Sequence, residues 1–322
     1  MRVDISEDDL LEAIRRVLSA DDPSIVVAIG DDAAVVRAGT GDLVLTTDAM
    51  VEGVHFDRAT TTARDVGYKA VAVAVSDVAA MAASPRFALS ALTLSDDVDA
   101  AWSMEFFGGM REACDEFAVA LVGGNVSGGP VVSVAVTITG EVGPGRAITR
   151  SGAKPGDMLV VTGTLGGAAA GLRLATEIVR GAALPDEARD AIRHQQRPTP
   201  RVGEAPVLAR LGATAMIDVS DGLGIDLARL CDASGVGARL DLGSVPVHPA
   251  AVAGEALGGG EDYELLATMP SDAAAAEAAA ELREVFGIPL TAIGEITADG
   301  LELVDADGAV RPLDRRGWDH FG

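Results

Sequence analysis

The sequence is poor in lysine, cysteine and aromatic residues. Lysine occurs only at Lys69 and Lys154, and the 25 Lys and Arg residues are outnumbered by 49 Asp and Glu, so the formal net charge is -24 at pH 7. A chain this acidic has little with which to neutralise a phosphate backbone, which argues against nucleic acid as a partner. A polyphosphate ligand would need bound cations at its site.

Two explanations of the acidic excess stay open. A solvated acidic surface keeps proteins dissolved at high salt, and the pattern fits a chain adapted to such conditions. A GC-rich genome also depletes lysine and enriches alanine and glycine.

The few sulfur and imidazole groups exclude other classes of protein. Cys114 and Cys231 are isolated, without CxxC spacing, so we expect buried thiols in a reducing compartment. The histidines are too scattered for a zinc site: His55, His194, His248 and His320. The sequence has no apolar run long enough to span a bilayer, and residues 1–18 are acidic and amphipathic. We therefore expect a cytoplasmic protein that binds no membrane.

The length of 322 residues predicts two domains. Residues 1–150 are predicted to form an α+β domain and residues 151–322 an α/β domain. Helices are expected over 6–19, 62–83, 99–117, 168–180, 223–234 and 272–286, and strands over 25–29, 86–94, 119–122, 131–142, 158–161, 213–219 and 265–269. Residues 33–36 and 43–47 are expected to pair as a hairpin around 39–42.

Acidic residues cluster between residues 29 and 56. Asp31 and Asp32 follow Gly30, and Asp48 follows the apolar run 43–45. Carboxylates drawn together repel one another, and a hard divalent cation with oxygen ligands commonly offsets that repulsion. The alternative is two acidic turns on a solvated surface.

Asp77 lies within the apolar helix predicted over 62–83. A carboxylate in such a helix is costly unless it is paired or binds a metal. The competing interpretation places Asp77 with Ser76 on a thin polar stripe.

Several glycine or acidic turns follow predicted strands. They are Gly30–Asp32, Thr46–Asp48, Gly123–Asn125, Asp218–Gly222 and Gly258–Glu264. The turn 162–167, between a predicted strand and helix, could also present backbone N–H groups to an anion, although such turns also serve packing.

Together these segments resemble the thiamine-monophosphate kinase family, within the aminoimidazole ribonucleotide synthetase-like superfamily. The matching motifs span the chain: GDDAAV at 30–35, TTDAMVEGVHF at 46–56, GYKAVAVAVSDVAAMAASP at 67–85, RSGAKPGD at 150–157, VTGTLGGAAAGL at 161–172, IDVSDGLGIDL at 217–227, GGEDYEL at 259–265 and GWDHF at 317–321.

The resemblance implies the superfamily's two-domain fold and ATP-dependent phosphorylation of thiamine monophosphate to thiamine diphosphate. Transfer would be direct and in-line, helped by several Mg²⁺ ions and without a covalent nucleophile. It also implies a homodimer joined through the N-terminal domains, for which the strand 131–142 is a plausible interface element.

Site residues are carried over by position. The implied metal ligands are Asp32, Thr46, Thr47, Asp48, Asp77, Asn125, Asp218 and Asp221. The implied ATP contacts are Gly124, Asn125, Arg150 and Ser220. The implied contacts to thiamine monophosphate are His55, Glu261 and Trp318, although a Trp near a C-terminus is also a common packing anchor.

The sequence departs from the family at Asn125, where most of these kinases have Asp. Asn keeps a carbonyl oxygen that can bind Mg²⁺ but brings no negative charge. The alternatives are a superfamily synthetase similar to formylglycinamidine ribonucleotide synthetase and a non-catalytic nucleotide-binding paralogue.

Overall fold

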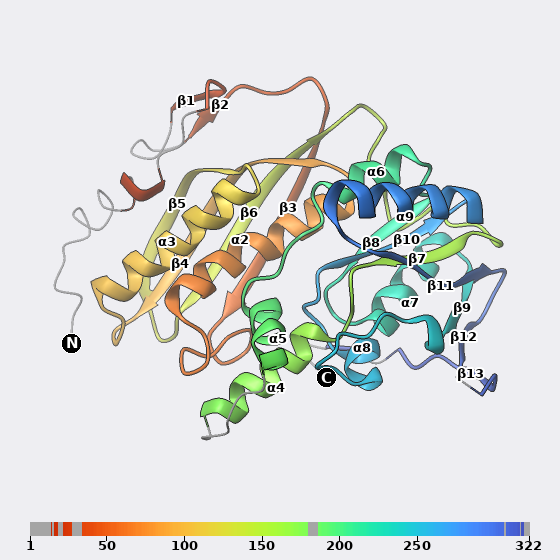
Figure 1. Cartoon of the computed structure of the whole chain (residues 1–322). Coiled ribbons are helices and arrows are strands. Elements are labelled where there is room, and N and C mark those ends of the chain that lie inside the picture. The colour runs from red at the N-terminus through yellow and green to blue at the C-terminus, as the bar shows by residue number, and fades with distance from the viewer. Residues whose placement is uncertain are drawn as a thin grey trace. The chain divides into compact units, whose positions relative to one another are not determined.

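The computed structural model describes residues 14, 16–18, 22–27, 34–179, 186–305, 307–315 and 317–318. Its contacts divide the chain into two compact units (Figure 1). The first unit holds the described residues up to Val78 together with Ala83–Gly145, and the second holds Ala79–Ala82 and the described residues from Arg146 onward. In the part of the chain that is described, no helix is long and apolar enough to cross a membrane.

The first unit is built on a four-stranded sheet in the order β3-β6-β4-β5. Its strands are β3 (Asp42–Val51), β4 (Ser84–Ser95), β5 (Ala120–Gly129) and β6 (Ser133–Val142), and its helices are α2 (Ala63–Ala80, whose last residues belong to the second unit) and α3 (Ala100–Glu116). A small separate sheet pairs β1 (Ile25–Val27) with β2 (Val35–Val36). The β4–β5 pair is parallel, and the β3–β6 and β4–β6 pairs are antiparallel.

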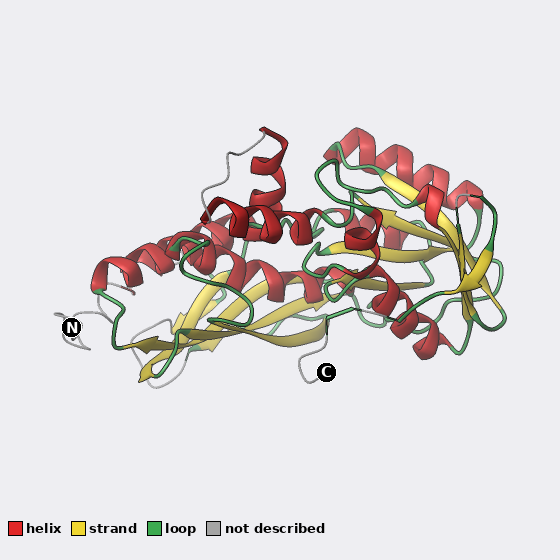
Figure 2. Ribbon diagram, turned by 90° about the horizontal axis from the view of Figure 1, so that it is seen from below, coloured by secondary structure: helices red, strands yellow, loops and turns green. Residues whose placement is uncertain are grey.

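The four-stranded sheet carries its helices on one face only (Figure 2). On that face, β6 places Val134, Val136 and Ile138, all at most 2% exposed. Residues that alternate with the buried ones along each strand face the other side of the sheet, where Leu43 and Leu45 of β3 are 65% and 64% exposed. We call this second side the open face of the sheet.

The hairpin predicted between residues 33–36 and 43–47 is wrong. The strand β2 pairs with β1, and β3 pairs along its whole length with β6, from Asp42 opposite Val142 to Val51 opposite Ser133. The turn residues at 39–42 suggested that β3 pairs with the segment just before it. The long alternating strand β6 is the better partner, because it pairs with β3 at ten positions.

The segment predicted as a turn at Gly123–Asn125 is also part of a strand. The strand β5 continues through it to Gly129, with Gly124 opposite Ser90 and Asn125 opposite Ala91. Glycine is required here because a Cβ on Gly124 would stand 2.2 Å from the Ser90 carbonyl oxygen. Pairing with β4 therefore overrides the local glycine signal.

The second unit contains a seven-stranded sheet in the order β13-β12-β9-β11-β7-β10-β8. Its strands are β7 (Met158–Thr162), β8 (Ala215–Val219), β9 (Gly237–Asp241), β10 (Glu264–Met269), β11 (Leu290–Thr297), β12 (Leu301–Val304) and β13 (Val310–Pro312). Its helices are α4 (Gly167–Val179), α5 (Asp186–Gln196), α6 (Glu204–Arg210), α7 (Leu223–Ser234), η1 (Leu242–Ser244), α8 (Ala253–Gly258) and α9 (Asp272–Phe286).

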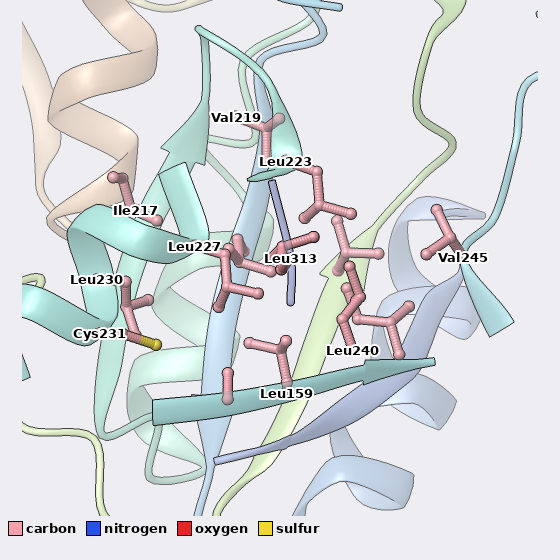
Figure 3. Packing of buried hydrophobic residues seen from close by; sticks show 14 of the residues in the cluster. Leu159, Ile217, Val219, Leu223, Leu227, Leu230, Cys231, Leu240, Val245 and Leu313 are labelled. Carbon is pink, nitrogen blue, oxygen red and sulfur yellow. The ribbon is translucent and has the colours of Figure 1, made fainter. Parts of the chain in front are cut away.

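Two apolar clusters cover the two faces of this sheet. One joins α7 and α8 to the strands through residues such as Leu159, Leu227 and Leu240 (Figure 3). The other joins α6 and α9 through residues such as Leu208 and Leu282. The sheet is therefore rigidly packed on both sides, and its strand ends are firm mounts for side chains.

Local signals set several helices correctly. The prediction for α9 is confirmed at both ends, because the Ser271 hydroxyl caps Ala274 N–H and Gly287 adopts the left-handed conformation with φ 70°. The Asp99 carboxylate caps α3 in the same way. Of the helix predicted over 6–19, Ile14 and residues 16–18 are helical, and the remainder lies outside the described residues.

Candidate functional site

Three of the proposed metal ligands lie on the helix-covered side of the first unit. Thr46 and Asp48 stand opposite Ile138 and Val136 in the β3–β6 ladder, on the buried face. The Thr46 hydroxyl donates a hydrogen bond to the Asp77 carboxylate of α2 at 2.5 Å. A helix carboxylate and a strand hydroxyl, far apart in sequence, are thus brought together as oxygen donors.

Thr47 and Asn125 lie on the open face instead. The Thr137 hydroxyl of β6 donates to Thr47 Oγ1 at 3.0 Å. Asn125 stands opposite Ala91 of the neighbouring strand β4, which is exposed, and so lies on the same face as Ala91. The alternation of β3 explains the separation, since successive side chains point to opposite faces. A ligand from Thr47 on the helix-covered face would have to be its main-chain carbonyl.

The open face is hollowed beside β5. A cavity of about 790 Å³ lies there, and its lining includes Gly124, Asn125 and Leu89 together with the charged residues Arg86 and Glu141. The β1–β2 pair borders it, because Ala34 and Val36 line the cavity and Ile25 and Ala34 pack near Phe87. Both sequence-predicted ATP contacts of the first unit therefore line one concave surface.

His55 lies just beyond the end of β3. Its Nδ1 accepts a hydrogen bond from Val51 N–H at 3.1 Å. A neutral imidazole that accepts at Nδ1 carries its proton on Nε2. The ring is therefore held as a donor, which suits contact with a phosphate or another oxygen acceptor.

In the second unit, the turn Ser220–Gly222 at the end of β8 joins three separate segments. The Ser220 carbonyl accepts from Glu261 N–H at 2.7 Å, and the Asp221 carbonyl accepts from Trp318 N–H at 3.0 Å. Gly317 must be glycine for this approach, since a Cβ there would stand 2.7 Å from the Asp221 oxygen. Four sequence-predicted site residues thus meet through their main chains.

Glu261 has an unusual backbone conformation, and Trp318 has an exposed side chain. Glu261 has φ 71°, a left-handed conformation that costs on the order of 1 kcal/mol in a residue other than glycine. Trp318 is 49% exposed. A packing anchor would be buried, so the exposure of Trp318 favours a ring available to a ligand.

Two further sequence-predicted site residues of the second unit, Arg150 and Asp218, have different environments. Arg150 is exposed, and its carbonyl accepts from the Ser234 hydroxyl of α7 at 3.0 Å. Asp218 is 2% exposed on β8, opposite Leu265 of β10. Asp31 and Asp32 fall outside the described residues.

The glycine turn predicted at 162–167 has one of its amides occupied from within the protein. Gly166 N–H and Ala168 N–H, at the start of α4, donate to the Asp262 carboxylate at 2.6 and 3.1 Å. Burial raises the pKa of Asp262 to about 7, and the two amides work in the opposite direction. The Gly166 amide of this turn is therefore occupied by the protein's own carboxylate rather than open to an external anion.

The neighbouring Glu264 is held by a buried ion pair. The Arg201 guanidinium donates to both of its carboxylate oxygens, one contact measuring 2.7 Å, and the Thr162 hydroxyl donates at 2.6 Å. Both partners are at most 10% exposed. Removal of one partner would leave a buried charge uncompensated, so the pair fixes the segment that carries Glu261.

Sequence reasoning missed Asp262 and also Asp226, a buried carboxylate on α7. Residues 223, 226, 227 and 230 fall on one helical face, and that face is otherwise leucine. A carboxylate at such a position is the same signal that singled out Asp77. The sequence therefore already contained the signal for a buried carboxylate at Asp226.

The oxygen donors fit Mg²⁺ better than a softer metal. The described residues contain no group of three or more His, Cys, Asp or Glu side chains placed to hold a metal ion. The first unit instead places the Asp77 carboxylate beside the Thr46 hydroxyl, with Asp48 on the same face of β3 as Thr46. Mg²⁺ is commonly held by one or two carboxylates together with substrate phosphates, so this donor set suits it.

Comparison with known proteins decides the family. Residues 30–142 match the family described as AIR synthase related protein, N-terminal domain, and residues 154–306 match its C-terminal domain. The thiamine-monophosphate kinase of Escherichia coli (strain K12) is 41% identical over 312 residues, covering 92% of each chain. The chain belongs to the thiamine-monophosphate kinase family.

Solved structures support the same placement. The thiamine-monophosphate kinase from Stenotrophomonas maltophilia K279a superposes with a TM-score of 0.83 at 36% identity, covering 94% of this chain and 97% of that one. The AaThiL structure, complexed with AMPPCP and TMP, has a TM-score of 0.76 at 31% identity and covers 100% of this chain and 99% of its own. The sequence-predicted fold and family are thereby confirmed.

Proposed function

We propose that this chain catalyses ATP-dependent phosphorylation of thiamine monophosphate to thiamine diphosphate. The observation that most supports this proposal is the turn Ser220–Asp221, whose carbonyls accept hydrogen bonds from the main chains of Glu261 and Trp318. The AaThiL complex with AMPPCP, an ATP analogue, and TMP supports the same substrate pair. Both a nucleotide contact and two substrate contacts are thus assigned to one rigidly mounted turn.

The reaction requires one displacement. A phosphate oxygen of thiamine monophosphate attacks the γ-phosphorus of ATP, the bond from that phosphorus to the β–γ bridging oxygen breaks, and ADP leaves with the electron pair. No side chain is needed as a nucleophile, so catalysis consists of positioning and neutralisation of charge.

Named residues would perform that positioning. The exposed ring of Trp318 would stack on a flat, cationic ring, and Glu261 would hydrogen-bond the aminopyrimidine. His55 would donate from Nε2 to a phosphate, and Ser220 and Arg150 would contact the nucleotide.

Within each unit, Mg²⁺ would be held by oxygen donors. They are Asp32, Thr46, Thr47, Asp48, Asp77 and Asn125 in the first unit and Asp218 and Asp221 in the second. Bound there, Mg²⁺ supplies neutralisation of phosphate charge.

We further propose a homodimer formed through the open face of the first unit. Leu43, Leu45 and Leu89 expose apolar surface on it, which a second copy would cover. The strands β3 and β5 are opposite edges of the sheet, about 14 Å apart by strand spacing. Asp48, on the helix-covered face, and Asn125, on the open face, therefore cannot share one ion within a chain.

Complementation between inactive variants tests this dimer. Asp48→Asn and Asn125→Ala are mixed after reversible unfolding. If the two residues act from different copies, mixed dimers contain one site with neither change, and the mixture regains up to about a quarter of wild-type activity. A monomer by light scattering would contradict the homodimer, and a mixture without activity would show that the two residues do not act from different copies.

The kinase assignment is tested directly. Purified protein with ATP, Mg²⁺ and thiamine monophosphate should yield thiamine diphosphate and ADP in equal amounts. Binding of ATP without turnover would indicate the non-catalytic paralogue, and turnover only with an amide substrate would indicate a synthetase.

The proposal includes a cytoplasmic location, which the free buried thiols Cys114 and Cys231 support.

A further inference from the structure

The turn Ser220–Gly222 is organised from beneath by one carboxylate. Asp226 Oδ2 accepts hydrogen bonds from Ser220 N–H at 3.1 Å, Asp221 N–H at 3.0 Å and Gly222 N–H at 3.1 Å. Asp226 is 0% exposed, so these bonds are shielded from water. Three successive amides that converge on one oxygen form a concave anion site, and here the anion belongs to the chain.

The outer side of the same turn carries the proposed substrate contacts. With the amides directed inward, the Ser220 and Asp221 carbonyls are left to hold Glu261 and Trp318. Because the Ser220 N–H is bonded to Asp226, Ser220 can contact ATP through its hydroxyl but not through its N–H. The inward bonds and the outward carbonyls are two sides of the same peptide planes, so one sets the direction of the other.

Arg229 completes the arrangement. Its Nη1 donates to Asp226 Oδ1 at 2.7 Å and to Asp221 Oδ2 at 2.5 Å. The guanidinium therefore compensates the buried Asp226 charge and also fixes the side chain of Asp221. Gly222 has φ 125°, a conformation open to glycine, which allows the turn to bend over the carboxylate.

We infer that Asp226 is a positioning residue of the proposed kinase site, holding the Ser220–Gly222 turn so that Ser220, Glu261 and Trp318 are presented to the two substrates. The inference rests on the proposed function. Asp226 itself touches neither substrate, because it is enclosed beneath the turn. Its loss should therefore weaken recognition of both substrates together, although no contacting atom is removed.

Asp226→Asn is the primary test. Asn has the same shape, but its NH₂ group must face either three N–H donors or the Arg229 guanidinium, and both are donors. A lost charge-assisted hydrogen bond corresponds to about a 10- to 100-fold change in an equilibrium constant. We expect KM for ATP and KM for thiamine monophosphate each to rise about tenfold or more, with a smaller change in kcat.

Asp157→Asn is the matched control. Asp157 is also buried, accepts a backbone hydrogen bond from Lys154 N–H at 2.9 Å and accepts from the Thr214 hydroxyl. It does not contact the turn. This variant should lose stability to a comparable extent yet keep both KM values, which separates positioning from a general loss of structure.

Tryptophan fluorescence gives a reading independent of turnover. The chain has two Trp residues, so Trp102→Phe leaves Trp318 as the single emitter. Titration with thiamine monophosphate, without ATP, should change Trp318 emission, and Asp226→Asn should require about tenfold more ligand. Unchanged KM values and an unchanged titration in the folded variant would overturn the inference.

Two further outcomes are decided by the same set of measurements. If wild type forms no thiamine diphosphate, the proposed function fails, whatever the variant does. If Asp226→Asn does not fold, Arg229→Gln takes its place, because the Arg229 side chain is 38% exposed and bonds Asp226 directly. A rise of both KM values in Arg229→Gln at saturating Mg²⁺ supports the inference, and unchanged values contradict it.

Discussion

The Trp318 main-chain N–H donates to the Asp221 carbonyl at 3.0 Å, although the two residues lie in distant parts of the sequence. The bond attaches the segment after β13 to the turn that follows β8. It places an exposed indole beside a carboxylate turn without using either side chain. The Asp221 side chain is held separately, by the Arg229 guanidinium.

Thr46 and Thr47 should differ sharply when each is replaced by valine. Thr46 donates to Asp77 on the helix-covered face, whereas Thr47 lies on the open face beside Thr137. We expect Thr46→Val to lower kcat about 10-fold or more, from loss of a hydrogen bond to a charged group. Thr47→Val should stay within about threefold if its ligand is the main-chain carbonyl. Equal losses would assign a ligand role to the Thr47 hydroxyl as well.

Asp77→Asn should reduce turnover by about 100-fold or more while the protein stays folded, because it removes charge that neutralises phosphates. The matched control is Asp65→Asn on the same helix. Asp65 accepts from the Thr62 hydroxyl at 2.6 Å, much as Asp77 accepts from Thr46 at 2.5 Å. Initial rates at saturating Mg²⁺ decide the outcome. A near wild-type rate for Asp77→Asn would remove this residue from the site.

Asp262 should make stability depend on pH. Burial raises its folded pKa from 3.8 to about 7, so the folded protein keeps a proton that the unfolded chain releases between these values. The stabilisation is present below pH 4 and is lost as pH rises through 7, at most on the order of 4 kcal/mol. Asp262→Asn should lack this dependence. Urea unfolding of both proteins at several pH values measures it, and parallel curves would contradict the prediction.

Asn125→Asp should lower the Mg²⁺ concentration needed for half-maximal rate, by about tenfold, because an added carboxylate strengthens binding of a hard cation. KM for thiamine monophosphate should change little. The measurement is a Mg²⁺ titration of the initial rate at fixed ATP. An unchanged requirement for Mg²⁺ would show that position 125 does not contact the ion.

The excess of acidic residues makes a separate prediction about salt. If the charge of -24 reflects adaptation to high salt, screening of self-repulsion should raise the melting temperature steeply between about 0.1 M and about 2 M KCl. A GC-rich genome with ordinary physiology predicts a flat curve. Thermal scans at equal protein concentration distinguish the two.

The sequence alone determined the elements whose signals are local. The helix α7 was predicted over its full span, and α9 was predicted with its Ser271 cap and Gly287 end. Side-chain period and capping chemistry are contained within a few residues, so they can be read directly. The family motifs likewise gave the fold and the family.

Long-range pairing and burial were decided only by the tertiary structure. The strand β3 pairs with β6 rather than β2, and Asn125 lies within a strand rather than a turn. Asp262 accepts from the Gly166 and Ala168 amides at the start of α4 because packing brings together segments that lie far apart in the sequence. A sequence shows that a residue can accept hydrogen bonds, but which donors reach it depends on how distant segments pack.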